Sequence, residues 1–218
     1  MLSIINIASA QQRPKEGLWL TLNTPVNFSG KWQWLNDAGY RTLDISTSAI
    51  QYYYRTAARY NFNKKWSVSS GIAFFFTRTI FTKASAEFGH EFRLWQEISH
   101  QHSLNKKLQI LLRARTEERF FAATSVRNKY TAYRLRLRPG LNQKINDKWS
   151  LQITDEYMRQ LTNNKFSFDQ NRITLSGIYH FSEKTQLQTG YLWLKWPKEN
   201  QHILSITLTK TISIHGKK

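Results

Sequence analysis

The chain has 218 residues, enough for one large domain, and 32 Lys and Arg residues against 14 Asp and Glu give a formal net charge of +18. It contains no Cys, which excludes disulfides and thiolate metal sites. The longest apolar candidate, 72–76, is far shorter than the roughly 18 residues of a membrane helix. A mean hydropathy of −0.56 is compatible with strands that alternate polar and apolar side chains.

The first ten residues resemble the end of a secretory signal peptide. They are mostly apolar and finish with Ala8-Ser9-Ala10, a small-residue pattern typical of cleavage sites, so that Gln11 would begin the mature chain. We therefore expect residues 1–10 to be a signal-peptide remnant and residues 11–218 to form the folded domain. An ordinary frayed N-terminus is the alternative.

Eleven long segments with a period of two follow in chain order. A period of two is typical of β-strands, because successive strand side chains point to opposite faces. Within the second segment, Asn36–Gly39 has the composition of a turn. The segments are 17–28, 32–46, 49–62, 66–80, 86–103, 107–121, 126–144, 148–162, 168–182, 185–196 and 201–214.

One short motif recurs between these segments. It consists of an apolar residue, a polar pair, Lys and then Trp or Leu, and only the last copy ends differently, in Thr185. The copies are Phe28–Trp32, Phe62–Trp66, Leu104–Leu108, Ile145–Trp149 and the weaker Phe181–Thr185. Their spacing of 34 to 42 residues fits two long strands and their connections, which places all the copies at one end of the molecule. Trp32, Trp66 and Trp149 would then form an aromatic girdle of the kind found at membrane interfaces.

The stretch 108–120 shows which face of a strand is apolar. Leu108, Ile110 and Leu112 share one face, whereas Arg113, Arg115, Glu117 and Arg119 share the other. An apolar exterior around a charged interior is typical of a transmembrane β-barrel. We predict an all-β, antiparallel up-and-down transmembrane barrel of 10–12 strands. Bacterial barrels have even strand counts, which favours ten or twelve.

The charged side chains are expected to line the lumen, where arginines and carboxylates on neighbouring strands can pair. Such a ladder would fill a narrow barrel, and the surplus arginines could hold an anion such as phosphate or a lipopolysaccharide head group. The expected lumen residues are Arg55, Arg59, Glu87, Glu91, Arg93, Glu97, Arg113, Arg115, Glu117, Arg119, Arg134, Arg136, Arg138, Glu156 and Arg172.

Five motifs in order resemble the domain of unknown function 2490 family. They are Glu91–Gln96, Arg113–Phe120, Arg134–Arg138, Asp155–Tyr157 and Phe168–Arg172, and the resemblance covers roughly 17–214. Asp155 departs from the small polar residue expected at its position. The resemblance implies an outer-membrane barrel, common in Bacteroidetes, with no assigned activity and no catalytic residues.

Four functions remain open on the sequence. The first is a structural or transport-accessory barrel of the bacterial outer membrane, in contact with lipid, lipopolysaccharide and other outer-membrane proteins. The second is a lipid-modifying enzyme using His100 and His102. A basic nucleic-acid-binding protein using Arg134–Arg138 and a passive channel for small solutes are the others. We expect no cofactor, no metal and no nucleic-acid partner.

Overall fold

A computed structural model describes residues 16–28, 30–42, 44–45, 49–79 and 87–214, which form strands and connections. The expected signal-peptide remnant, residues 1–10, lies outside the described residues. The helix search over the described part of the chain finds none that is long and apolar enough to cross a membrane.

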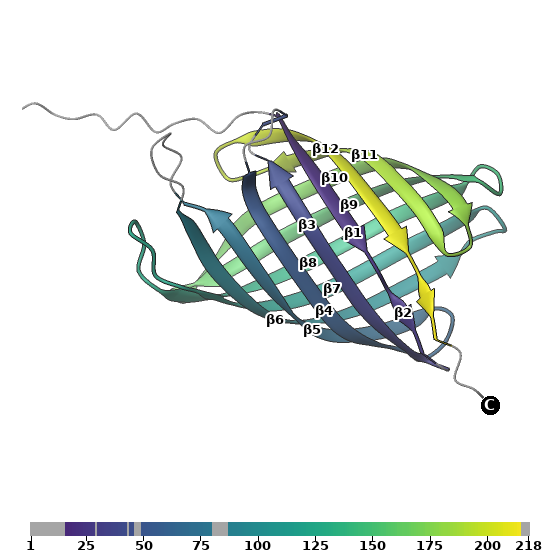
Figure 1. The fold of residues 1–218 in the computed structure, drawn as a ribbon, viewed down its shortest axis with the longest axis horizontal. Helices are drawn as coiled ribbons and strands as arrows, with labels where there is room; N and C mark the ends of the chain where they lie inside the picture. The colour runs from purple at the N-terminus through teal and green to yellow at the C-terminus, as the bar shows by residue number, and fades with distance from the viewer. Residues whose placement is uncertain (1–15, 29, 43, 46–48, 80–86, 215–218) are drawn as a thin grey trace, which may run out of the picture.

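Thirteen strand segments follow one another along the described chain (Figure 1). They are β1 (Glu16–Asn23), β2 (Val26–Asn27), β3 (Trp32–Thr42), β4 (Ala49–Asn61), β5 (Trp66–Arg78), β6 (Phe88–Ser103), β7 (Leu108–Phe121), β8 (Tyr130–Lys144), β9 (Trp149–Thr162), β10 (Lys165–Ser182), β11 (Thr185–Lys195), β12 (Asn200–Lys210) and β13 (Ile212–Ser213).

The segments form one closed barrel. Each of β3 to β11 pairs antiparallel with the next in sequence, and β1 closes the sheet by pairing with both β3 and β12. β1 and β2 are one strand interrupted at Thr24 and Pro25, and β12 and β13 are one strand interrupted at Thr211. The described residues therefore form eleven strands, and the all-β barrel fold is confirmed.

The expectation of an even, wholly antiparallel barrel is wrong. With an odd number of alternating strands, the first and the last run in the same direction. β1 therefore pairs parallel with β12, from Glu16 opposite His202 to Asn23 opposite Thr209. β2 and β13 continue the parallel seam. Odd counts are known among membrane barrels. The eleven segments predicted from the alternation match the strands, whereas the rule of even strand counts wrongly favoured ten or twelve.

The predicted turn at Asn36–Gly39 is also wrong, because β3 runs straight through it. Asn36 lies opposite Thr56 and Gly39 opposite Tyr53 in an unbroken antiparallel ladder. The ring of Tyr53 lies over Gly39 so closely that a Cβ there would stand 2.1 Å from it. The glycine is thus required by the close approach of an aromatic ring inside the barrel.

The repeated motif forms tight turns at one end of the barrel, here called the turn end. In the second copy, the Asn63 side-chain oxygen accepts hydrogen bonds from the backbone N–H groups of Lys65 (2.8 Å) and Trp66 (2.9 Å). Asn105 and Asn146 make the same pair of bonds in the next two copies. The opposite end, where β1 begins, is called the loop end (Figure 1, left). Asparagine therefore recurs because its side chain closes the turn.

Asn105→Ala should lower the free energy of unfolding by about 1 kcal/mol, because two side-chain hydrogen bonds to the turn backbone are lost. Denaturant unfolding in detergent micelles measures the change. Lys106→Ala, one residue further along the same turn, is the control and should leave the stability within about 0.5 kcal/mol. Equal losses in both variants would show that the asparagine does not close the turn.

Side chains on the two faces of the barrel wall differ as the alternation predicts. The outer face is apolar: Phe74, Leu94, Leu137 and Leu175 are all exposed. The inner face holds most of the charge, and the buried polar set includes four carboxylates and five arginines. Small apolar clusters complete the interior, one around Trp95 and Phe75 and one at Leu194 and Ile203.

Candidate functional site

The charged inner wall is built around Glu117 on β7. Its carboxylate lies 2.5 Å from Arg136 and 3.2 Å from Arg93, with Arg134 at 3.7 Å and Arg115 at 3.8 Å. Arg134 and Arg136 come from β8, which pairs with β7, and Arg93 comes from β6 on the other side. Four guanidinium groups thus share one buried carboxylate because three adjacent strands present them at the same level.

Two carboxylates of β6 repeat this arrangement. Glu97 lies 2.6 Å from Arg115, 3.4 Å from Arg113 and 3.6 Å from Arg59. Glu91 lies 2.6 Å from Arg93 and 2.5 Å from Arg119. Glu91 and Glu97 lie an even number of residues apart on one strand, so both point inward. The pairs therefore form a ladder along β6 and β7.

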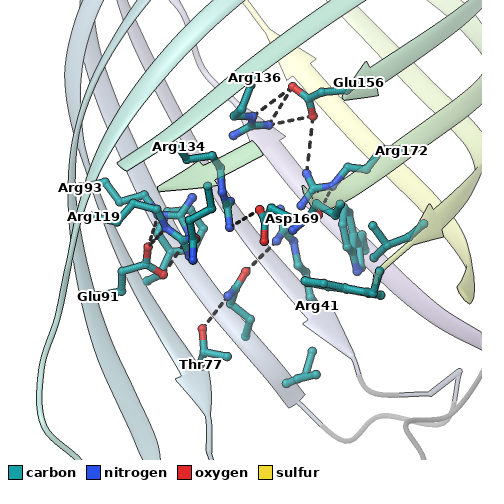
Figure 2. A pocket seen from close by; sticks show the side chains of 18 of the residues that line it. Arg41, Thr77, Glu91, Arg93, Arg119, Arg134, Arg136, Glu156, Asp169 and Arg172 are labelled. Carbon is teal, nitrogen blue, oxygen red and sulfur yellow. Dashed lines mark hydrogen bonds and ion pairs between the residues drawn. The ribbon is translucent and has the colours of Figure 1, made fainter. Parts of the chain in front are cut away.

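Three further carboxylates extend the ladder around the wall. Glu156 on β9 lies 2.8 Å from Arg136 and also binds Arg113 and, at 3.8 Å, Arg172. Asp169 on β10 lies 2.7 Å from Arg134 (Figure 2). Asp37 on β3 lies 2.5 Å from Arg55 on β4. Paired charges of this kind avoid the large cost of an isolated buried charge.

Several of the guanidinium groups lie over the face of an aromatic ring. The guanidinium carbon of Arg93 lies 3.6 Å from the centre of the Phe75 ring, and that of Arg115 lies 4.2 Å from the Trp95 ring. The flat guanidinium stacks on a ring while its edge remains available for hydrogen bonds. Stacking and pairing together hold these arginines in fixed orientations.

The structure brings fourteen of the fifteen expected lumen residues to the inner wall. Arg138 lines the cavities with the others, but among the described residues no carboxylate oxygen lies within 4.0 Å of it. Glu87 is the exception: it precedes β6 and accepts hydrogen bonds from Ser125 in the β7–β8 connection. Those bonds hold the pKa of Glu87 below its usual range.

Sequence reasoning missed Asp37, Asp169 and Arg41 as inner-wall residues. Asp37 was hidden because its segment has the composition of a turn, although Asp37 and Arg41 share the phase of an inward face. Asp169 could not be found from the alternation. A bulge between Phe168 and Gln170 shifts the register of β10 there, so Asp169 and Gln170 both line the same cavity.

The ion pairs do not fill the lumen, contrary to the expectation of a filled barrel. They follow the wall formed by β3 to β10, and two large cavities remain. A loop-end cavity of about 740 Å³ reaches Arg127 and Tyr130, and a turn-end cavity of about 530 Å³ reaches Pro25. Both are lined by Trp19, Arg55, Arg113 and Arg138, which therefore stand where the cavities meet.

The two cavities differ in charge. Eleven arginines and three carboxylates line the loop-end cavity. The turn-end cavity is lined by five arginines, two carboxylates and many neutral Thr, Ser, Asn and Gln side chains. The inner wall as a whole is therefore strongly basic, and the surplus is concentrated toward the loop end.

The histidines do not form a recognisable catalytic group. The ring of His100 lies tilted against that of Trp66, with 4.2 Å between ring centres, and the ring centres of His100 and His102 are 6.3 Å apart. Ser150 and His180 are hydrogen-bonded at 3.2 Å near the turn end, but among the described residues no carboxylate is hydrogen-bonded to that imidazole. In the same part of the chain, no group of three or more His, Asp and Glu side chains is placed to hold a metal ion.

These features define a class of protein: a closed eleven-stranded β-barrel with an ion-paired, basic interior. A family model described as "Protein of unknown function (DUF2490)" matches residues 16–201, so the chain belongs to that family. The match covers β1 to the start of β12 and includes all six inner-wall carboxylates described above. A comparison with curated proteins found no match.

Proposed function

We propose that this protein is an integral barrel of the bacterial outer membrane with a structural or transport-accessory role. The observation that carries the proposal is the inverted distribution of side chains across the wall. Leu175 on the outer face is 55% exposed, whereas Glu117 on the inner face is 3% exposed. A wall of this kind would place a continuous apolar surface against water in a soluble protein, whereas it suits hydrocarbon.

Aromatic side chains at both ends of the barrel support the same proposal. At the turn end, Trp32, Trp66 and Trp149 are exposed and lie beside Tyr60, His100 and Tyr179 respectively. At the loop end, Tyr52 lies between Tyr40 and Phe88. Two aromatic bands with an apolar belt between them match the two interfaces of a bilayer. The partners in this proposal are membrane lipid, lipopolysaccharide and other outer-membrane proteins.

Fractionation and heat-modifiable migration test the proposal. The protein expressed with a secretory signal should appear in the outer-membrane fraction, resist extraction by alkali, and migrate faster in detergent gels before boiling than after it. A protein that stays in the aqueous fraction, folded and monomeric without detergent, would contradict the proposal.

Asp155 offers a second test, because it is a carboxylate in the middle of the outer face. It lies on β9 opposite Ile173, and among the described residues no Lys or Arg nitrogen lies within 4.0 Å of it. In a bilayer, Asp155→Leu should raise the free energy of unfolding by about 1 kcal/mol, because a charged group leaves the hydrocarbon. Urea unfolding in phospholipid vesicles measures this.

The matched control for Asp155 is Asp147→Leu, at a turn where the carboxylate lies 2.7 Å from Lys144 in water. That exposed pair contributes little, so the control should not gain stability. A stabilisation of the Asp155 variant in vesicles that is absent for the control is the expected result. Equal stability of wild type and Asp155→Leu in vesicles would argue against a hydrocarbon environment.

A passive channel is the second candidate, and the two cavities favour it. They meet at Arg55, Arg113 and Arg138, so a conducting path would cross a basic constriction and select anions. The structural role predicts no steady conductance of the purified protein in planar bilayers. Steady, anion-selective conductance would contradict the structural role and support the channel.

A further inference from the structure

Two arginines in the loop-end cavity share one aromatic ring. Arg41 on β3 and Arg172 on β10 both stack on Trp19 of β1, with guanidinium carbons 3.9 Å and 4.9 Å from its ring centre. Arg41 donates a hydrogen bond to Gln51 at 2.7 Å, and among the described residues no carboxylate oxygen lies within 4.0 Å of it. Arg172 donates to Gln170 at 2.8 Å and has its nearest carboxylate, Glu156, at 3.8 Å.

Their position explains why, in the described part of the chain, neither arginine has a carboxylate closer than 3.8 Å. Trp19 lies on the parallel seam between β1 and β12, and the seam side of the cavity carries neutral residues such as Thr42, Leu192 and Gln201. The three carboxylates that line the cavity are each closer to another arginine: Glu91 to Arg119, Asp169 to Arg134 and Glu156 to Arg136 (Figure 2). Arg41 and Arg172 thus place two positive guanidinium groups on one ring. The cavity around them is lined by eleven arginines and only three carboxylates.

The cavity in front of this pair has the size and charge of a site for a small anion. Its volume of about 740 Å³ falls within the usual range of ligand pockets, about 300–1,000 Å³. Arg134, which is buried, has an Nε atom without a hydrogen-bond partner, and it lines the same cavity. The planar guanidinium edge matches the oxygens of phosphate, and a dianion offsets more of the surplus charge than a carboxylate does.

We propose that Arg41 and Arg172, stacked on Trp19, bind a phosphate monoester group in the loop-end cavity. The site is reached from the loop end, and the cavity has room for a small polar body attached to the phosphate. The inference goes beyond the membrane role and does not rest on it. The phosphate could belong to a free solute or to a lipid head group, and the experiment separates the two.

Binding should be measured by titration calorimetry on the whole protein in a phosphate-free, non-ionic detergent. Inorganic phosphate and glycerol 3-phosphate are the free probes, and phosphatidic acid in mixed micelles is the lipid probe. Saturable binding that needs the phosphate, with glycerol and phosphatidylcholine inactive, is expected. Binding of the free probes assigns the site to solutes, and binding of phosphatidic acid alone assigns it to a lipid head group.

Arg41→Gln and Arg172→Gln should each weaken binding at least about tenfold, because each removes charge-assisted hydrogen bonds. Arg159→Gln is the control: this arginine donates to the Phe166 backbone outside the cavity and should leave binding unchanged. Arg41→Lys keeps the charge but not the planar edge, and should bind more weakly than wild type. Heat-modifiable migration shows that each variant is folded.

Absence of saturable phosphate binding to the folded wild type would overturn the proposal. So would equal binding by wild type, Arg41→Gln and Arg172→Gln. Neither result would contradict the membrane proposal, because that proposal is argued from the outer face and is tested by fractionation, not by binding in this cavity.

Discussion

Glu117→Gln should lower the free energy of unfolding by about 3–5 kcal/mol, the largest effect expected of any single substitution in this barrel. The carboxylate is within 4.0 Å of four arginines from two neighbouring strands and its own. Without its charge, Arg93 and Arg136 lose their shared partner and the buried wall gains uncompensated positive charge. Urea unfolding of the refolded protein in detergent or vesicles, followed by tryptophan fluorescence, measures the loss.

Glu118→Gln is the matched control for that experiment. Glu118 is the next residue on β7 and points outward, where its carboxylate accepts a hydrogen bond from the Tyr133 hydroxyl at 2.9 Å. Loss of that single bond should cost less than about 1 kcal/mol. A Glu117 variant no less stable than the Glu118 variant would mean that the ion-pair ladder does not hold the wall together.

Leu175→Arg is expected to have the second-largest effect, and its size depends on the solvent around the barrel. In a bilayer, an arginine at mid-height of the outer face should destabilise the protein by about 2–4 kcal/mol. In water the same substitution on a residue that is 55% exposed would be nearly neutral. Urea unfolding of the wild type and of the variant in phospholipid vesicles measures the loss.

Phe181→Arg is the control for the outer wall. Phe181 lies near the turn end of the same strand, β10, and is 60% exposed. Close to an interface, a charged substitution should cost at most about 1 kcal/mol. A gradient from Leu175 to Phe181 supports a bilayer around the barrel, and equal small effects at both positions would remove that support.

The period-two alternation determined the fold class and the assignment of faces. Strands of 11–18 residues carry enough side chains for an apolar set and a charged set to be separated by phase alone, as in 108–120. The expectation that arginines and glutamates face each other followed from this phase, since both must point to the same side.

At two positions the local sequence does not predict the structure. Asn36–Gly39 has turn-like residues, yet it forms a strand because Asp37 pairs with Arg55 and Gly39 accommodates Tyr53. The bulge at Phe168–Gln170 breaks the phase on which the alternation depends, and so it concealed Asp169. In both places contacts from a neighbouring strand outweighed local preference.

The sequence by itself therefore determined that the chain alternates into strands with an apolar and a charged face, because alternation is a property of each strand alone. Only the tertiary structure decided the parallel closure of β1 on β12, which an odd number of strands requires, and the cavities inside the wall. Those features depend on register between strands that are distant in the chain. The pair of arginines on Trp19 belongs to the second group, since the closure of the barrel brings β3 and β10 to β1.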